Sequence, residues 1–278
     1  VFDVGAKWAA IAIILQVFSG LPLWVGILLS GGVSLIYSTI GGLWADALTD
    51  FVQFVIQLIA GLTMFIIILA KLGGISEIGG MWSKLPQHHS DLLAGPYTFW
   101  FVFAYLFIDF LSYNGGTWNL AQRYIATPNA KEARKSAILS GFLYLFWPLI
   151  LFFPMWAAPI FFPDLDQPDQ AYAILVTHFL PPGLIGLVLA GMFSHTMAMT
   201  TSDANAISSV VTRDILPVLT GKKQSLTSKG ALFAGRITTL IFVLLTLLIA
   251  IYQNSFGGVL GLIITWFGAL VGPVSIPM

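Results

Sequence analysis

Long apolar segments are the feature of this sequence that most limits its possible folds. A helix needs roughly 20 predominantly apolar residues to cross the hydrocarbon core of a bilayer, and about eight segments meet that requirement. They cover approximately residues 4–20, 22–41, 48–71, 97–118, 134–161, 183–211, 230–252 and 256–277. A lipid environment offers the backbone no hydrogen-bond partners, so unbroken apolar runs of this length must form helices. The sequence therefore predicts an all-α polytopic membrane protein.

Composition narrows the class of protein further. Of the 278 residues, 58% are hydrophobic and 9% are charged, whereas soluble domains carry about 25% charged residues. The formal net charge is zero, which gives no electrostatic basis for nucleic-acid binding. The sequence contains no cysteine, and therefore offers neither disulfides nor thiol chemistry. It contains no Gly-rich phosphate loop, nucleophile elbow or HExxH motif, so we expect no enzyme, no catalytic residue and no organic cofactor.

Loop charges predict how the segments are oriented, because loops rich in Lys and Arg stay in the cytoplasm. Two loops carry basic clusters, with Arg123, Lys131, Arg134 and Lys135 after the fourth segment and Arg213, Lys222, Lys223 and Lys229 after the sixth. Lys7 falls on the same side of the membrane. The opposite side is mainly acidic, and there residues 171–180 are expected to form a short amphipathic helix at the interface. We therefore predict a multi-pass protein of the plasma or inner membrane with cytoplasmic basic loops.

The stretch Phe101–Arg123 combines an apolar helix with features that are costly inside a bilayer. Asp109 needs a partner or water there, and the pair Gly115-Gly116 weakens the helical backbone. Transporters use broken helices of this kind at the bilayer midplane, where freed backbone groups hold substrates and ions. This favours a binding role for Asp109 and for Asn114. The alternative is a tightly packed, kinked helix that contains a buried, protonated Asp109.

Polar side chains gather in the sixth segment, at Ser194, His195, Thr196, Thr200, Thr201, Ser202, Asp203 and Asn205. Ser and Thr alone are common where membrane helices pack. Hydroxyl groups beside a carboxylate, however, are hard oxygen ligands that suit a cation. We therefore expect this helix to bind an ion or a proton, with a solvated cytoplasmic position of Asp203 as the alternative.

A second polar stripe begins at Asp50 and continues at helical spacing with Gln53 and Gln57. Because the stripe runs into the third segment, it indicates a binding role for Asp50. Alternatively, Asp46 and Asp50 lie near the start of a helix and complement its dipole. Capping is the favoured interpretation for Asp46, whereas both interpretations stay open for Asp50.

These stretches together resemble the sodium:solute symporter family, which includes bacterial proline, pantothenate, sialic acid and sugar symporters. The resemblance rests on residues that occur in the family's order and at similar spacing: Ile36-Tyr37 to Gly41-Gly42, Thr49-Asp50, Gln53, Tyr113, Gln122-Arg123, Asn129 to Arg134, Asn205 and Thr212 to Asp214. It covers most of the chain. It implies a single transmembrane transporter domain over residues 1–278 with the leucine-transporter-type fold of five plus five inverted helices. The segments then correspond to the third through tenth core helices, and we expect an internal fragment that lacks the first two core helices and the C-terminal helices.

The resemblance also implies roles for individual residues. Tyr113 matches the aromatic residue that closes the substrate site from the cytoplasmic side. Tyr144 is expected at the same solute site, where sugar-transporting relatives have a Lys, and this difference argues against their sugar specificity. The principal sodium site of relatives uses two hydroxyl residues, and the matching positions are Ala198 and Met199, which offer no side-chain oxygen.

A second sodium site is implied by three other matches. Asp50 corresponds to an acid that some members use there, and the hydroxyls of Thr201 and Ser202 match its other positions. A cation site formed by these three residues is therefore predicted.

We therefore expect a secondary active transporter that moves a small organic solute inward together with a cation. Sodium is the first choice of coupling ion, and the proton, carried by Asp109 or Asp203, is the second. Three alternatives stay open: a family member without a coupled ion, a membrane sensor with a signalling domain elsewhere, and an amino-acid permease of another family with the same fold. The predicted partners are the solute, the ion and the lipid bilayer, and the sequence does not identify the solute.

Overall fold

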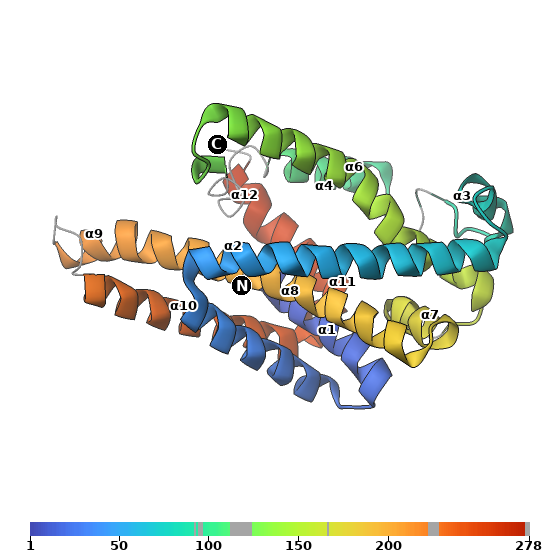
Figure 1. Ribbon diagram of the computed structural model, residues 1–278, viewed down its shortest axis with the longest axis horizontal. Coiled ribbons are helices and arrows are strands. Elements are labelled where there is room, and N and C mark those ends of the chain that lie inside the picture. Colours follow the sequence, from blue (N-terminus) through green and yellow to red (C-terminus); the bar gives the residue numbers. More distant parts are fainter. Residues whose placement is uncertain (92, 94–96, 112–123, 166, 222–227, 276–278) are drawn as a thin grey trace.

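The computed structural model describes residues 1–91, 93, 97–111, 124–165, 167–221 and 228–275, and for residues 37–47, 228–229 and 274–275 it describes the backbone alone. Within these residues the chain is helical and contains no strand, which confirms the all-α prediction. The helices pack side by side as an elongated bundle (Figure 1). The bounds of the elements are α1 Phe2–Ser19, α2 Leu23–Leu72, α3 Glu77–Gly80, η1 Met81–Lys84, α4 Phe99–Leu111, α6 Ala130–Phe161, η3 Pro168–Gln170, α7 Ala171–Phe179, α8 Pro182–Val210, η4 Val211–Ile215, α9 Leu216–Thr220, α10 Ser228–Ile251, η5 Gln253–Phe256, α11 Gly258–Thr265, η6 Trp266–Val271 and α12 Gly272–Ser275.

Five stretches of helix among the described residues are long and apolar enough to cross a bilayer. They are Phe2–Ser19, Leu48–Leu72, Ala130–Phe161, Pro182–Thr220 and Gly230–Ile251. Three shorter apolar helices, Leu23–Ile36, Phe99–Leu111 and Gly258–Val271, coincide with the remaining predicted segments. Large apolar side chains also face outward, for example Trp100 on α4 and Leu145 on α6, which are 74% and 65% exposed. Such exposure suits contact with lipid, and the protein is a multi-pass membrane protein.

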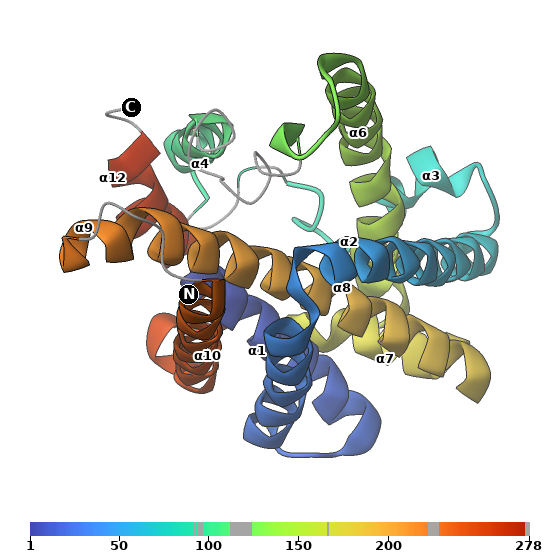
Figure 2. The same ribbon diagram turned by 60° about the vertical axis from the view of Figure 1, so that its left-hand side comes forward.

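Helix α2 contains two of the predicted membrane segments in one continuous helix of 50 residues. Its first part, 23–36, and its second part, 48–72, run in different directions (Figures 1 and 2). The turn that the sequence predicted around Asp46 and Asp50 is therefore helical. Neither acid lies in the first turn of a helix, so the capping interpretation of both residues is wrong. The backbone of Asp50 is instead in a helix interior, where its side chain follows the same helical stripe as Gln53 and Gln57.

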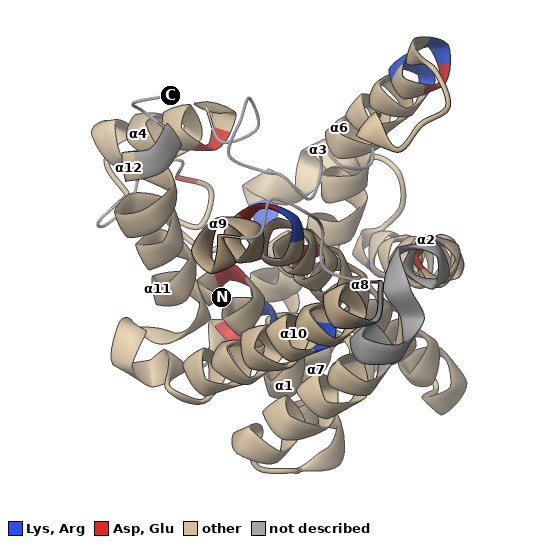
Figure 3. Ribbon diagram, turned by 90° about the vertical axis from the view of Figure 1, so that its left-hand side faces the viewer, with Lys and Arg blue, Asp and Glu red and all other residues tan. Residues whose placement is uncertain are grey.

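The ends of the bundle agree with the predicted sidedness. The N-terminal end of α6 and the short helix α9 lie at one end, whereas α3 and α7 lie at the other (Figure 1). Helix α6 starts at Ala130 because the Asn129 side chain accepts a hydrogen bond from the Glu132 N–H at 3.0 Å, which caps the helix. Charged residues gather at this end of α6, whereas most of the other helical ribbon carries none (Figure 3).

The core consists of two apolar clusters on either side of α8. One joins α2, α6, α7 and α8 around Met64, Phe153 and Leu175. The other joins α1, the first part of α2, α8 and α10 around Trp8, whose indole N–H donates to the Thr246 hydroxyl at 3.2 Å. Helix α7 buries one face in the core, with Tyr172 and Leu175 among its buried residues, whereas Thr177 and His178 on it are exposed.

Helices α2 and α8 approach each other very closely because small residues face each other between them. A Cβ added at Gly191 would lie 2.8 Å from the Cβ of Ala60 and 3.4 Å from the Cα of Gln57. Membrane helices gain packing energy in this way, since small residues let the two backbones come together. Gly191 and Ala60 therefore fix the separation of α2 and α8.

Replacing Gly191 should test this contact. We expect Gly191→Ala to be less stable than Gly186→Ala by about 1–3 kcal/mol, since the added methyl overpacks the α2–α8 contact. Gly186 lies on the same helix, and a Cβ there would meet nothing within 4 Å, so this control keeps the gain in helix propensity without the clash. Thermal unfolding of the full-length protein in detergent measures the difference. Equal stability of the two variants would contradict the close approach.

Candidate functional site

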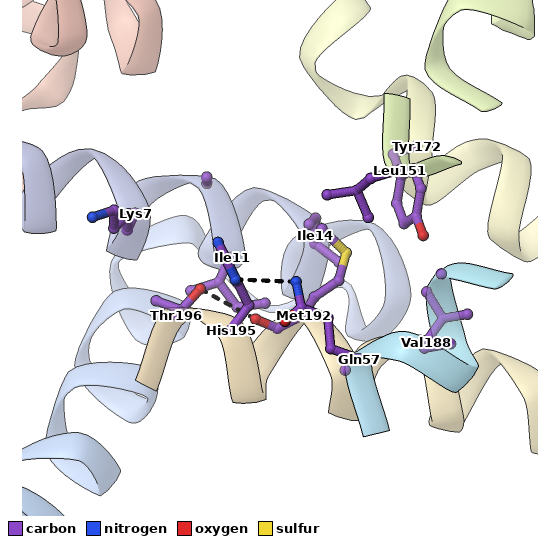
Figure 4. Close-up of a pocket in the computed structure, with 14 residues that line it drawn as sticks. Lys7, Ile11, Ile14, Gln57, Leu151, Tyr172, Val188, Met192, His195 and Thr196 are labelled. Carbon is purple, nitrogen blue, oxygen red and sulfur yellow. Dashed lines mark hydrogen bonds between the residues drawn. The ribbon is translucent and has the colours of Figure 1, made fainter. Parts of the chain in front are cut away.

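A cavity of about 150 Å³ lies where α1, α2, α6, α7 and α8 meet. Its walls are mainly apolar, with Ile11, Ile14 and Met192 among them, and its polar residues are Lys7, Gln57, Tyr172, His195 and Thr196 (Figure 4). Tyr172 and Thr196 are buried, whereas His195 is exposed. Cavities with apolar walls and a few converging polar groups are typical of small-molecule sites.

A hydrogen bond between α2 and α8 is the central polar feature of this cavity. The side-chain nitrogen Nε2 of Gln57 lies 3.1 Å from Nδ1 of His195 (Figure 4). An amide nitrogen can only donate, so Nδ1 of the neutral imidazole accepts and the ring proton sits on Nε2. Gly191 and Ala60 bring the two backbones together one helical turn away, and the Gln57 and His195 side chains can therefore reach each other. The pair therefore depends on the close packing of α2 and α8.

A second cavity of about 220 Å³ borders the same pair. It shares Gln57, Leu151 and His195 with the first cavity and adds the aromatic residues Phe54, Tyr144 and Trp147. Tyr144, a residue that the sequence placed in the solute site, thus lies beside Gln57 and His195. The Gln57–His195 pair therefore borders both cavities.

Lys7 reaches the first cavity from α1. It was predicted to lie at the cytoplasmic side, but it is one and a half turns inside the helix and lines the cavity with Gln57 and His195. Its ammonium group donates to the Asp3 carboxylate one turn earlier on α1. The ammonium group carries three N–H donors, so this ion pair leaves donors for other groups.

The predicted cation residues are distributed over α2 and α8. Asp50 and Ser202 are half-buried, and Thr201 is 1% exposed. The Thr201 hydroxyl donates to the carbonyl oxygens of Met197 and Ala198, both at 3.1 Å. Its oxygen keeps lone pairs with which it can bind a cation. Ala198 supplies only a backbone carbonyl oxygen, and this oxygen already accepts from Thr201.

The packing of α2 against α8 determines how far Asp50 and Ser202 lie along their helices from the Gln57–His195 pair. The second part of α2 and α8 run in opposite directions (Figures 1 and 2). Ala60 faces Gly191, and Gln57 faces His195. Going from the first pair to the second leads toward Asp50 on α2 and toward Ser202 on α8. Asp50 and Ser202 each lie about two helical turns, roughly 10 Å, from the Gln57–His195 pair and on the same faces of their helices. Asp50 and Ser202 are therefore each seven residues from the Gln57–His195 pair, on helices that run in opposite directions.

The predicted residues of the fourth segment are not joined to these cavities. Tyr113 and Asn114 lie outside the described residues. Asp109 is half-buried on α4, and it lines neither of the two cavities. Helix α4 packs instead against η6 and α12, with the rings of Tyr105 and Phe267 4.7 Å apart. The structure therefore places Asp109 in a different part of the bundle from the polar groups of α2 and α8.

The Gln57–His195 pair was not predicted, although both residues had been noted in polar stripes. The signal in the sequence is an equal spacing in the two helices. Gln57 follows Asp50 by seven positions, and His195 precedes Ser202 by seven positions. Lys7 was missed because a single base near the start of an apolar segment is typical of a membrane boundary.

Comparisons with known proteins agree with this architecture. The model of the sodium:solute symporter family matches residues 1–278. The human sodium/iodide cotransporter is 29% identical over 95% of this chain and 43% of its own length. The human sodium/myo-inositol cotransporter 2 is 27% identical over 94% of this chain and 44% of its own length. The rabbit sodium-dependent multivitamin transporter is 27% identical over 99% of this chain and 45% of its own length. The chain thus spans less than half the length of these relatives.

A solved structure shows the same fold. It is the substrate-bound, outward-open state of a Na⁺-coupled sialic acid symporter, with a TM-score of 0.79 and 21% sequence identity. The match covers 99% of this chain and 59% of that one. The chain therefore has the leucine-transporter-type fold that its sequence predicted.

Cysteine labelling should show that the first cavity is open to small reagents. Ala10 lines the cavity, whereas Ala12 on the same helix is 0% exposed. Residues 1–278 contain no cysteine, and any cysteine elsewhere in the full-length protein is replaced first. We then expect Ala10→Cys to react with a small hydrophilic methanethiosulfonate. Ala12→Cys should stay unlabelled, as mass spectrometry can determine. Equal labelling at both positions would contradict the observed packing of α1.

Proposed function

Because the chain belongs to the sodium:solute symporter family, we propose that the whole protein is a secondary active transporter that couples sodium entry to uptake of a small solute. The observation that carries this proposal is the family match over residues 1–278. The names of the relatives support it, since they describe sodium-coupled proteins for iodide, myo-inositol and vitamins. These solutes differ widely, so the relatives support the coupling ion better than any particular solute.

We propose that residues 1–278 form one transporter domain and that their apolar helices occupy the third through tenth positions of the ten-helix core. The order of the helices along the chain supports this assignment. On it, α2 supplies the fourth and fifth core helices and α8 supplies the eighth. Both helices that border the Gln57–His195 pair would then belong to the core.

The cation site that we propose consists of the Asp50 carboxylate and the hydroxyl oxygens of Thr201 and Ser202. The register of α2 against α8 supports it, because Asp50 and Ser202 are each seven residues from the Gln57–His195 pair on antiparallel helices. A carboxylate compensates the ion's charge, and hydroxyl oxygens are hard ligands of the kind that sodium prefers. The side chains of Ala198 and Met199 provide no such oxygen, so the principal sodium site of relatives lacks its side-chain ligands at these positions.

Coupling follows from the position of this site. A cation that binds both α2 and α8 stabilises the state in which the two helices are close, and the same state forms the Gln57–His195 pair two turns away. A solute that binds beside the pair would then gain affinity from the bound ion, and the ion would gain affinity by the same factor from the solute. Entry of one Na⁺ across a potential of about 100 mV releases about 2.3 kcal/mol, enough for roughly 40-fold solute accumulation before the sodium gradient is counted.

Binding of ²²Na⁺ to the purified full-length protein tests the proposed cation site. We expect saturable binding to wild type and at least about tenfold weaker binding to Asp50→Asn and Thr201→Val, because each substitution removes an oxygen ligand or its charge. Thr200→Val is the matched control, since Thr200 is also buried on α8 and its hydroxyl donates to the carbonyl oxygen of Thr196. It should bind sodium as wild type does.

Two results would count against this proposal. Absence of sodium binding to wild type would reject sodium coupling, and a proton-coupled transporter would then be tested with a pH gradient. If Asp50→Asn and Thr201→Val both bind sodium with wild-type affinity, the ion binds at a site other than the proposed one.

A further inference from the structure

We propose that helix α6 carries a binding site for a phospholipid with an anionic headgroup, in the membrane leaflet at the cytoplasmic end of the bundle. The site consists of two basic residues, Lys131 and Arg134, followed by exposed apolar side chains on the same face of the helix. It lies apart from both cavities. The proposal therefore goes beyond solute transport and does not depend on sodium coupling.

Helix α6 has one face toward the protein and an opposite face that is exposed. The face toward the protein borders the second cavity, with Trp147 near its centre. Successive residues of a helix are rotated by about 100°, which places a second set of positions on the side opposite Trp147. All residues of this set are exposed: Lys131, Arg134, Ile138, Phe142, Leu145, Leu149, Phe152 and Trp156. We call them the outer stripe of α6.

The length of the outer stripe matches the thickness of a bilayer. Arg134 and Trp156 are 22 residues apart, which corresponds to about 33 Å of helix, and the hydrocarbon core is about 30 Å thick. At the outer end, the rings of Trp156 and Trp82 lie 5.7 Å apart, and tryptophans are enriched where membrane meets water. The apolar part of the stripe thus lies at the depth of the acyl chains, and its bases lie at the depth of the cytoplasmic headgroups.

The two bases of the outer stripe have no acidic partner in the part of the chain that the structure describes. The neighbouring acid, Glu132, pairs instead with Lys135 at 2.8 Å. Lys131 also lies in the first turn of α6, at the positive end of the helix dipole, where a cation is unfavourable. Figure 3 shows these charges at the tip of a helix that otherwise carries none. An anion beside Lys131 and Arg134 would compensate both the bases and the dipole.

A phospholipid matches both parts of the outer stripe. Its phosphate can accept two hydrogen bonds from the Arg134 guanidinium group and another from the Lys131 ammonium group. Its acyl chain can lie along Ile138, Phe142 and Leu145, which begin one turn deeper in the membrane and are each more than half exposed. A soluble anion would contact the bases alone, and the choline cation of phosphatidylcholine offsets the charge of its phosphate. A headgroup with net negative charge is therefore the best match.

Photo-crosslinking of lipids to the full-length protein tests this site. The protein is reconstituted in phosphatidylcholine vesicles with a trace of phosphatidylglycerol or phosphatidylcholine that carries a diazirine in its acyl chain, and mass spectrometry locates the cross-links. We expect phosphatidylglycerol to label residues 138–149 at least about tenfold more than phosphatidylcholine, since each base near an anionic headgroup adds about a factor of five. Lys131→Gln/Arg134→Gln should reduce this labelling to the phosphatidylcholine level, whereas Lys131→Arg/Arg134→Lys should keep most of the preference.

Arg213→Gln/Arg236→Gln is the matched control for the loss of two positive charges. Both arginines are exposed toward the same end of the bundle, on η4 and α10, and neither belongs to the outer stripe. This variant should keep the full preference for phosphatidylglycerol. Every substitution changes an exposed side chain, and thermal unfolding of each variant identifies folded protein.

Four results would overturn the lipid site. Two of them are equal labelling of residues 138–149 by the two lipids, and an unchanged preference in Lys131→Gln/Arg134→Gln. Another is an equal loss of preference in Arg213→Gln/Arg236→Gln, which would indicate a general effect of surface charge. The last is absence of labelling by either lipid, which would show that another part of the full-length protein or a second copy covers the outer stripe.

Discussion

The contact between Gly191 on α8 and Ala60 on α2 is the constraint on which the rest of the site depends. At this point the two backbones are so close that one added methyl group would clash. The same closeness lets Gln57 and His195 form a hydrogen bond across the interface. A wider interface would leave two polar side chains in an apolar environment without partners, which is costly within a membrane. Packing of small residues therefore creates the polar chemistry of this site.

The two proposed binding sites share one pair of helices. The proposed cation ligands Asp50, Thr201 and Ser202 lie about two turns from the Gln57–His195 pair, which borders both cavities. An ion and a solute would thus bind to the same two helices without sharing a ligand. Each could then favour the same packing of α2 against α8, which is the physical requirement for energetic coupling between two sites.

Much of the fold could be predicted from the sequence, because the length of an apolar run and the charges of its flanking loops directly reflect the bilayer. The helices α1, α6, α8 and α10 lie where their apolar runs predicted. The helical connection through Asp46 and Asp50 was not predicted, since a polar stretch between apolar runs looks the same whether it forms a turn or a bent helix. The burial of α7 was missed for a related reason, because a short amphipathic helix can face lipid headgroups or a protein core.

The site was only partly predictable. Hydroxyl groups and carboxylates in apolar segments identified α2 and α8 as the polar helices, but pairing Gln57 with His195 requires the register between them, which no single segment contains. Tyr144 was predicted from a resemblance and lies beside that pair, whereas Asp109 lies elsewhere and Tyr113 and Asn114 are outside the described residues. Lys7 shows the limit most clearly, since only the packing of α1 against α8 turns a boundary residue into a cavity residue.

Cryo-electron microscopy of the full-length protein in sodium, at a resolution that shows side chains, tests the register of α2 against α8 most directly. We predict density for an ion between Asp50 and Ser202, about two helical turns from a formed Gln57–His195 hydrogen bond. Asp50 and Ser202 at different levels or on faces turned away from each other would contradict the proposed link between the ion and the solute.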